Sequence, residues 1–325
     1  MTRLLIAAAF PPRRVARRAV AVFGLAAICG APVLAQDREG GQPVRRITID
    51  AVAIDRDNNP ITDLKTEEME VWIGGFRVPI EAFEAITPGS GGDDGRLIVL
   101  LLDDMMLPLQ LVPRVREAAK RFVNRMGPDD RMAVVMLNGG VMESTSDRAK
   151  LFRSIDAYNV RPSGVMRIDI LGAHIFRTVE ALGRRLAEAP GRRGAIVAIG
   201  VSWIFDRPIA TPAISRDLRP EWTAAMRAMA IARANLYVIE PAGVGMSPVG
   251  GGAGGFAHAT GGHAFLNTND LTGVADRIMR ETGNYYLIAV ADPPAQRKAE
   301  LRELEVRVLR RGVTVRAREF LAGHQ

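Results

Sequence analysis

Two neighbouring aspartates follow an apolar run at a position where carboxylates can do chemistry. Asp103 and Asp104 come directly after residues 97–102, which are all apolar. In a sheet of parallel strands, ligands bind outside the carboxyl ends of the strands. Carboxylate oxygens at such an edge are hard ligands of the kind that Mg²⁺ prefers. The pair is therefore a candidate metal or partner-binding site, and solvation or capping of the next helix is the structural alternative.

Ser202 is the second candidate because it follows another apolar run, residues 195–199. A serine at such a turn resembles a nucleophile elbow, which requires a small residue two positions later, and Ile204 is not small. No spacing ties Ser202 to any of the histidines that could act as its base, which are His174, His258 and His263. A serine hydrolase is therefore kept only as a second alternative. The adjacent Trp203 is a candidate binding anchor, with burial under a loop as the alternative.

The glycine-rich segment 243–255 matches a dinucleotide-binding pattern only by count. Its glycines at 250, 252 and 255 do not come directly after a strand, and no long helix follows them at once. The segment is better interpreted as a loop that contacts a partner, or as a tolerated insertion. No cofactor is predicted.

Composition narrows the class of protein. The 325 residues are 48% hydrophobic and 24% charged, which is typical of a globular chain and excludes a disordered chain or a multi-span membrane protein. The formal charge is +7, and removing the five arginines of residues 1–35 leaves +2. Because the remainder has no block of lysine and arginine, a nucleic-acid partner is not expected.

The N-terminus has the pattern of a secretory signal. Five arginines lie within residues 3–18, and an apolar stretch covers residues 19–35. Val33 and Ala35 suit the −3 and −1 positions of a cleavage site. Cleavage after Ala35 would leave a chain with no cysteine and no membrane span. The signal pattern therefore predicts a periplasmic or secreted protein. An uncleaved anchor and lipidation at Cys29 are the alternatives, although Ile28 is a poor match to a lipoprotein signal.

Three regions of different pattern follow the signal. Residues 36–86 contain alternating strands, with Gly74-Gly75 as a hairpin turn, and residues 87–95 form a linker. Residues 96–282 alternate fully apolar runs with amphipathic helices, which predicts a doubly wound, mostly parallel α/β sheet. Residues 283–325 return to strands. Since neither end has enough strands for a domain alone, we expect them to pair into one small β-sandwich. The apolar runs are 97–102, 132–137, 195–199 and 236–239, and the helical stripes run over 112–126, 222–229 and 271–279.

This order of parts resembles bacterial secreted proteins with a von Willebrand factor type A-related domain, over about residues 44–320. The segments that carry the resemblance are 100–104, 128–135, 190–197, 234–241, 260–271 and 285–287. The resemblance implies a binding site at the strand carboxyl ends, where many type A domains hold Mg²⁺ with an Asp-x-Ser-x-Ser motif. It also implies a further threonine and a second aspartate from later loops.

The sequence departs from that metal site. Asp103 keeps the first position, but Met105 and Leu107 stand where the motif has serines, and neither side chain binds Mg²⁺. No carboxylate follows residues 195–199 until Asp206, and the threonine loop near 162–172 offers only Ser163 and Asp169. We therefore expect no bound metal. Divalent-metal-dependent adhesion through Asp103, Asp104 and Asp206 is the first alternative.

The sequence thus predicts an exported, non-enzymatic protein-binding scaffold with unknown protein partners in the cell envelope. The expected surface joins loops near 103–107, 163–169, 202–206 and 243–255. Its candidate partner-binding residues are Asp103, Asp104, Met105, Ser202 and Trp203.

Overall fold

The computed structural model describes residues 45–88, 95–140, 142–160, 167–189, 193–203, 216–245, 253–293 and 299–323. The predicted signal segment 1–35, most of the predicted linker, Ser163 and Asp206 lie outside these residues. Residues 44–325 form one compact unit. No helix in the described ranges has the length and apolar character needed to cross a membrane.

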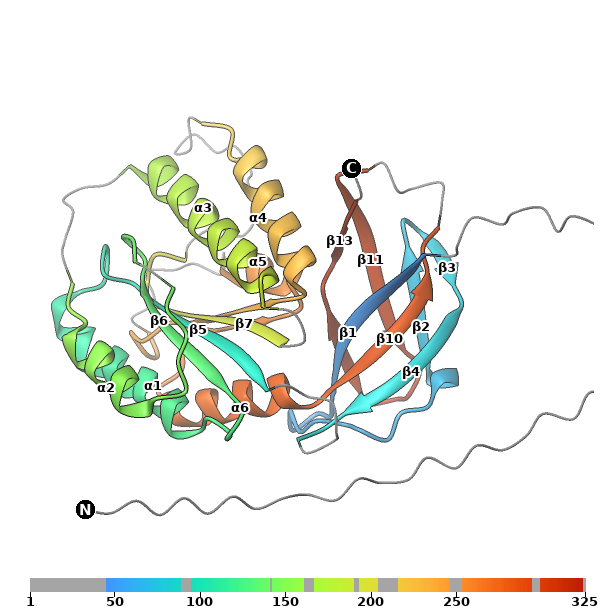
Figure 1. The fold of residues 1–325 in the computed structure, drawn as a ribbon, viewed down its shortest axis with the longest axis horizontal. Helices are drawn as coiled ribbons and strands as arrows, with labels where there is room; N and C mark the ends of the chain where they lie inside the picture. Colours follow the sequence, from blue (N-terminus) through green and yellow to red (C-terminus); the bar gives the residue numbers. More distant parts are fainter. Residues whose placement is uncertain are drawn as a thin grey trace, which may run out of the picture. The chain divides into compact units, whose positions relative to one another are not determined.

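The centre of this unit is a five-stranded parallel sheet with helices on both faces (Figure 1). Its strands lie in the order β6-β5-β7-β8-β9, and every neighbouring pair is parallel. Four of the five strands come from the apolar runs that predicted them. Their bounds are β5 (Arg96–Leu102), β6 (Arg131–Met136), β7 (Arg193–Ile199), β8 (Asn235–Ile239) and β9 (His263–Phe265).

Two separate apolar cores fix the helices to the sheet. One core packs α1, α2 and α6 on one face, and the other packs α3, α4 and α5 on the opposite face. Alternate residues of each strand enter opposite cores, because strand side chains alternate in direction. The bounds are α1 (Val112–Asn124), α2 (Arg148–Ala157), α3 (Ile168–Ala187), α4 (Arg219–Ala232), α5 (Ala253–Ala259) and α6 (Leu271–Gly283).

The chain changes direction in the sheet between β5 and β7. From β5 it moves outward to β6, and it then crosses to the other side of β5 to form β7. In open α/β sheets the crevice at such a switch point is the usual ligand site. The residues that follow β5 and β7, which include Asp103 and Ser202, therefore hold the position where a ligand is expected.

The two ends of the described chain form the expected β-sandwich. One sheet has the order β12-β1-β10-β4, in which strands from before and after the α/β part alternate. The other has the order β13-β11-β2-β3, in which two strands from after it lie beside two from before it. Gly74 and Gly75 have φ values of 55° and 82° and form the predicted two-residue turn between β2 and β3. The bounds are β1 (Arg46–Ile54), β2 (Met69–Ile73), β3 (Phe76–Val78), β4 (Ile80–Ile86), β10 (Tyr285–Ala291), β11 (Leu301–Val308), β12 (Thr314–Ala317) and β13 (Phe320–Ala322).

Buried ion pairs tie the sandwich to the α/β part. Asp50 on β1 accepts hydrogen bonds from Arg233, which ends α4, and from Arg318 at 2.9 Å. Glu281 on α6 pairs with Arg316 of β12 at 2.9 Å and with Arg277 at 2.8 Å. Both carboxylates are almost fully buried. Since buried charges are costly unless paired, the loss of one partner would leave an unpaired buried charge where the two parts meet.

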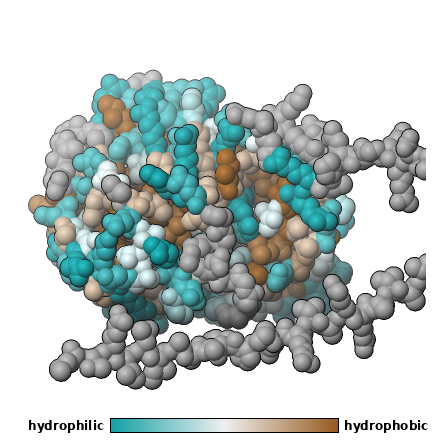
Figure 2. Space-filling model, viewed as in Figure 1, coloured by the Kyte–Doolittle hydropathy of each residue, from teal (hydrophilic) through white to brown (hydrophobic). Residues whose placement is uncertain are grey.

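Apolar side chains still reach the surface in places. On the face that Figure 2 shows, hydrophobic residues appear in small groups between hydrophilic ones. Eight large hydrophobic side chains in the described ranges are exposed.

Candidate functional site

Asp103 joins the ends of β5 and β7. Its Oδ1 accepts hydrogen bonds from the backbone N–H groups of Met105 at 3.1 Å and Met106 at 3.0 Å. Its Oδ2 accepts from the N–H groups of Val201 and Ser202, each at 3.0 Å, and from Ser202 Oγ at 2.7 Å. The residue is 1% exposed. The carboxylate therefore closes the crevice at the switch point with hydrogen bonds inside the chain.

These contacts leave Asp103 unsuited to a metal. An ionised carboxylate offers about four lone-pair sites, and five donors already point at the two oxygens of Asp103. In the part of the chain that the structure describes, no group of three or more histidine, cysteine, aspartate or glutamate residues is arranged to hold a metal ion. The residues present do not fit the Mg²⁺ site that the family resemblance implies.

Asp104 also bonds inside the chain. It is buried, and its Oδ1 accepts a hydrogen bond from the backbone N–H of Asn138 at 2.8 Å, which fixes the turn after β6. Tyr158 donates its hydroxyl to the backbone carbonyl of Asp103. Burial, followed by the charges of Asp103 and Asp104, raises the pKa of Tyr158 well above its usual value. Both aspartates thus hold neighbouring loops, and neither is solvated.

Met105 and Leu107 show why the serine positions are apolar in this chain. Met105 packs into the core on the α3 and α4 face, whereas Leu107 packs into the core on the α1 and α6 face. The loop after β5 therefore fastens to both faces of the sheet through apolar contacts. Here apolar packing occupies the positions where the family motif has metal-ligating hydroxyls.

Gly200 is the residue that lets Asp103 reach β7. A Cβ atom at position 200 would lie 2.1 Å from Cβ of Asp103 and 2.7 Å from its Oδ2. Any larger residue would push the carboxylate away from Val201 and Ser202. Glycine is therefore required at position 200 because of its close approach to Asp103. The sequence alone does not reveal this contact, since it shows only a glycine after a strand.

The five predicted partner-binding residues come together at this edge, but their side chains do not form an exposed surface. Each of Asp103, Asp104, Met105, Ser202 and Trp203 is less than a tenth exposed. For Trp203, burial is the outcome, and the indole packs in the core with Phe256. The interpretation of these side chains as surface contacts is corrected accordingly, because hydrogen bonding and packing place them in the interior.

Among the described residues, no histidine hydrogen-bonds Ser202, so Ser202 lacks the base that a nucleophilic serine needs. Its hydroxyl donates to Asp103, and the residue is buried. His174 instead hydrogen-bonds the carbonyl of Leu137 at 2.7 Å, and His258 lies 3.8 Å from Glu319. The elbow-like position of Ser202 therefore serves to anchor Asp103.

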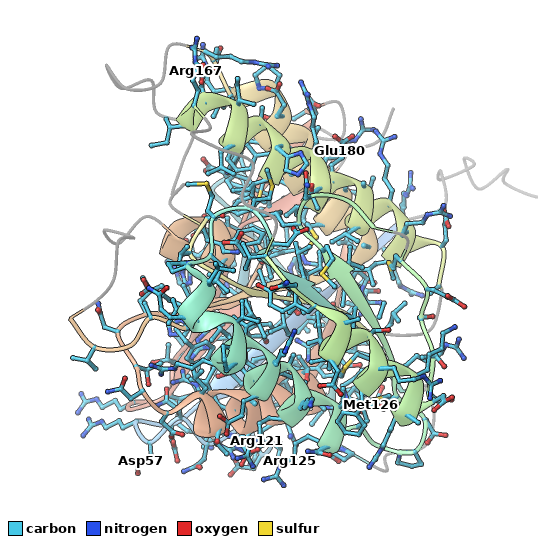
Figure 3. The ribbon with its side chains drawn as sticks, turned by 90° about the vertical axis from the view of Figure 1, so that its left-hand side faces the viewer. Asp57, Arg121, Arg125, Met126, Arg167 and Glu180 are labelled. Carbon is cyan, nitrogen blue, oxygen red and sulfur yellow. The ribbon has the colours of Figure 1, made fainter. Side chains whose placement is uncertain are left out.

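Asp169, the other predicted oxygen, lies in the first turn of α3. It pairs with Arg167 at 2.8 Å, just before the helix begins. Figure 3 shows Arg167 at this end of α3 and Glu180 farther along the helix. Asp169 therefore stabilises the start of a helix, where a carboxylate interacts favourably with the helix dipole.

Glu240 is a site residue that sequence reasoning missed. It follows β8 directly, is 0% exposed, and neither carboxylate oxygen has a hydrogen-bond partner among the described residues. The indole N–H of Trp203 is likewise buried without a partner. The sequence did contain a signal for Glu240, because an acidic residue follows the apolar strand within the segment 236–241. Native proteins leave few buried polar groups unpaired, so both side chains are unusual.

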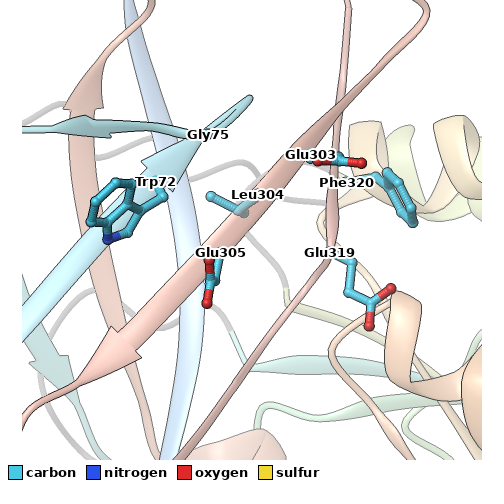
Figure 4. A pocket seen from close by; sticks show the side chains of 7 residues that line it. All are labelled: Trp72, Gly75, Glu303, Leu304, Glu305, Glu319 and Phe320. Carbon is cyan, nitrogen blue, oxygen red and sulfur yellow. The ribbon is translucent and has the colours of Figure 1, made fainter.

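A groove on the sandwich is separate from this edge. It has a volume of about 320 Å³ and lies beside Trp72, Leu304 and Phe320 (Figure 4). Trp72 is half-buried, and the guanidinium of Arg307 lies 4.6 Å from the centre of its ring. The groove also has three glutamates, of which Glu305 pairs with Arg307. The complete lining is Trp72, Gly75, Glu303, Leu304, Glu305, Glu319 and Phe320.

Comparison with known proteins finds matches among solved structures. No family model matches the chain, and no curated protein matches it. Among solved structures it is similar to the human COPII-coat protein Sec24c, with 9% identity and a TM-score of 0.33, over 74% of this chain and 46% of that one. It is also similar to the manganese-loaded TRAP protein of Plasmodium vivax, with 12% identity and a TM-score of 0.35, over 73% of this chain and 96% of that one. The chain thus spans less than half the length of Sec24c.

Proposed function

We propose that this protein is an exported, non-enzymatic protein-binding module that works without a metal. Its binding face is the C-terminal edge of the parallel sheet, formed by the loop after β5, the loop after β8 and the first turn of α3. The resemblance of the sequence to von Willebrand type A-related proteins and the signal-like N-terminus support this proposal. The comparisons with solved structures are too distant to add to it.

The observation that carries the proposal is where exposed apolar side chains lie. Five of the eight exposed large hydrophobic residues of the described chain belong to this edge. Leu109 and Val244 are the most exposed of these, at 62% and 63%. Exposed apolar groups that cluster on one side of a protein are typical of interaction sites. The five residues are Met106, Leu109, Ile168, Ile170 and Val244.

Two of the segments that carry these residues are in contact. A Cβ atom on Gly243, next to Val244, would lie 3.2 Å from Nη1 of Arg114 on α1 and 2.4 Å from Oδ1 of Asn269. The loops after β8 and β9 therefore meet the first turn of α1, close to Leu109. In the loop after β5, Asp103 accepts hydrogen bonds from the N–H groups of Met105 and Met106. Met106 is thus presented on a loop whose backbone is held by hydrogen bonds.

Site-specific photo-crosslinking in envelope extract tests the proposal. A photoreactive residue at Leu109 or Val244 should give the same discrete protein adduct, and EDTA should not reduce its yield. The matched controls are Ile231 and Leu309, which are apolar and 57% and 56% exposed but lie outside this edge. Equal adducts at the control positions, or an adduct lost with EDTA, would contradict the proposed face or its independence from metal.

A further inference from the structure

Three of the four edge strands of the sandwich are covered or short. β12 has four residues and ends against the segment after α5, because a Cβ atom on Gly261 would lie 2.9 Å from the backbone carbon of Ala317. β13 packs on α4, where Phe320 meets Trp222 edge to face. β3 has three residues and is followed by Pro79, which has no N–H group to donate. Proteins protect strand edges from other strands with such features, and β4 is the remaining edge.

β4 lacks this protection over most of its length (Figure 1). Its seven residues include no proline or lysine, and β10 is the only described element with which β4 makes extensive contact. The register shift between Ala289 and Val290 disturbs the pairing only at the start of β4, so residues 82–86 pair regularly with β10. Within the described ranges, the outer side of this regular stretch has no strand beside it.

The apolar core of the sandwich is also incompletely covered along β4. Ile80, Phe83 and Ala85 pack against this core, and each stays only partly buried. Phe83 stacks on Tyr286 of β10, with ring centroids 4.8 Å apart, and Tyr286 is 1% exposed. The core is therefore closed at β10 and open at β4. An edge with unpaired backbone groups and apolar side chains is the kind of surface that receives another strand.

The sequence of β4 is complementary to a second copy of itself. An antiparallel pair related by a two-fold axis places one residue opposite its own copy, and complete overlap of β4 selects the central Phe83. Each Glu84 then lies opposite Ala82 of the second copy, whereas an axis through Glu84 would oppose two carboxylates, which is destabilising. The full set of pairs is Phe83 with Phe83, Ala82 with Glu84, Glu81 with Ala85 and Ile80 with Ile86.

We propose that β4 pairs in antiparallel fashion with β4 of a second copy of the chain, so that one sheet of each sandwich continues into the other. Because a single strand pair forms this contact, the dimer dissociates readily and is not an obligate one. The interface is separate from the proposed binding face, so either can exist without the other. The dimer carries two copies of that face and would bind a repeated partner with greater avidity.

Sedimentation equilibrium of the protein measures the association. We expect a reversible monomer–dimer equilibrium with a dissociation constant below about 100 µM. A protein that stays monomeric up to about 1 mM overturns the inference. Open-ended assemblies larger than a dimer also overturn it, because the two-fold pairing closes after two copies.

Opposite charges at position 82 test the register, because Ala82 is exposed and lies opposite Glu84 in the dimer. Ala82→Lys brings a lysine to each Glu84 and should lower the dissociation constant at least about threefold at low salt. Ala82→Glu opposes two carboxylates at both places and should raise it at least about threefold. Adding Glu84→Lys to Ala82→Glu should reverse that loss. Shifts of equal size and direction for Ala82→Lys and Ala82→Glu overturn the inference.

Asn124 provides the matched control. It is exposed on α1, and Asn124→Lys and Asn124→Glu change the net charge by the same amounts as the variants of Ala82. Neither should shift the dissociation constant, while circular dichroism reports the fold of every variant. Shifts as large as those at position 82 would attribute the effect to net charge and overturn the inference. If Leu109 crosslinks while the protein stays monomeric, the dimer inference fails and the proposed face stands. A dimer without any crosslink gives the reverse result.

Discussion

The carboxylate of Asp103 and the hydroxyl of Ser202 are joined by a 2.7 Å hydrogen bond that links the ends of β5 and β7. These strands flank the switch point of the sheet, where the crevice of an α/β fold usually opens to a ligand. In this protein the bond, with the N–H contacts around it, closes the crevice. Binding at this edge must therefore use the loops above the crevice or displace interior side chains.

Asp103→Ala should be among the most destabilising single substitutions in the protein. It leaves as many as five donors without their acceptor in a buried position, and we expect a loss of about 4 kcal/mol in the free energy of unfolding. Ser202→Ala removes only one of the donors and should cost about 1 kcal/mol. Urea denaturation of the two variants measures the difference. Similar losses for both would show that the backbone donors do not depend on Asp103.

Gly200→Ala tests the same link from the opposite strand. The added methyl group would lie 2.1 Å from Cβ of Asp103, so the carboxylate must move away from Val201 and Ser202. We expect a loss of about 3 kcal/mol, as for overpacking of a core. Gly254→Ala is the matched control because its Cβ would meet nothing within 4 Å and it lies in α5. Thermal unfolding should separate the two variants, and an unchanged melting temperature for Gly200→Ala would contradict the close approach.

Asp50 should couple the stability of the sandwich to that of the α/β part. Asp50→Asn removes the charge that Arg233 and Arg318 share and leaves two buried or half-buried guanidinium groups beside a neutral amide. Breaking a buried ion pair from one side costs about 3–5 kcal/mol. Calorimetry should show a lower melting temperature. Glu305→Gln, which breaks the exposed pair with Arg307, should leave the melting temperature unchanged.

The sequence predicted the frame of the fold better than the details of the site. The apolar runs identified β5, β6, β7 and β8 because strands buried on both faces have no polar positions. Helix α3 was not predicted, since its exposed Ile168 and Ile170 obscure the polar face of its pattern. At the site, Asp103 was interpreted as a partner-binding residue, because the donors from residues 201 and 202 are almost a hundred positions away in the chain. Local patterns do not contain such contacts.

His263 should make the protein less stable as the pH falls. Burial, followed by the charges of Arg316 and Arg277, lowers the pKa of His263 to about 4. The unfolded chain binds this proton near pH 6.5, so between pH 6.5 and 4 the unfolded state binds more protons and stability decreases with decreasing pH. After allowance for the partial exposure of the ring, the loss is about 1–2 kcal/mol. His263→Gln should flatten this part of the profile in urea denaturation at a series of pH values, and parallel profiles would contradict it.

Calorimetric titration with Mg²⁺, Mn²⁺ and Ca²⁺ should give no saturable heat. The oxygens of Asp103 already accept five hydrogen bonds, and Met105 and Leu107 fill the positions of the hydroxyl ligands with apolar packing. A metal would have to break these contacts before it gained any ligand. Saturable binding that disappears in Asp103→Asn would instead mean that the aspartate opens to a cation, and acidic groups on the partner would then be the expected chemistry. Binding that persists in Asp103→Asn would place the ion elsewhere and leave the hydrogen-bonded role of Asp103 unchanged.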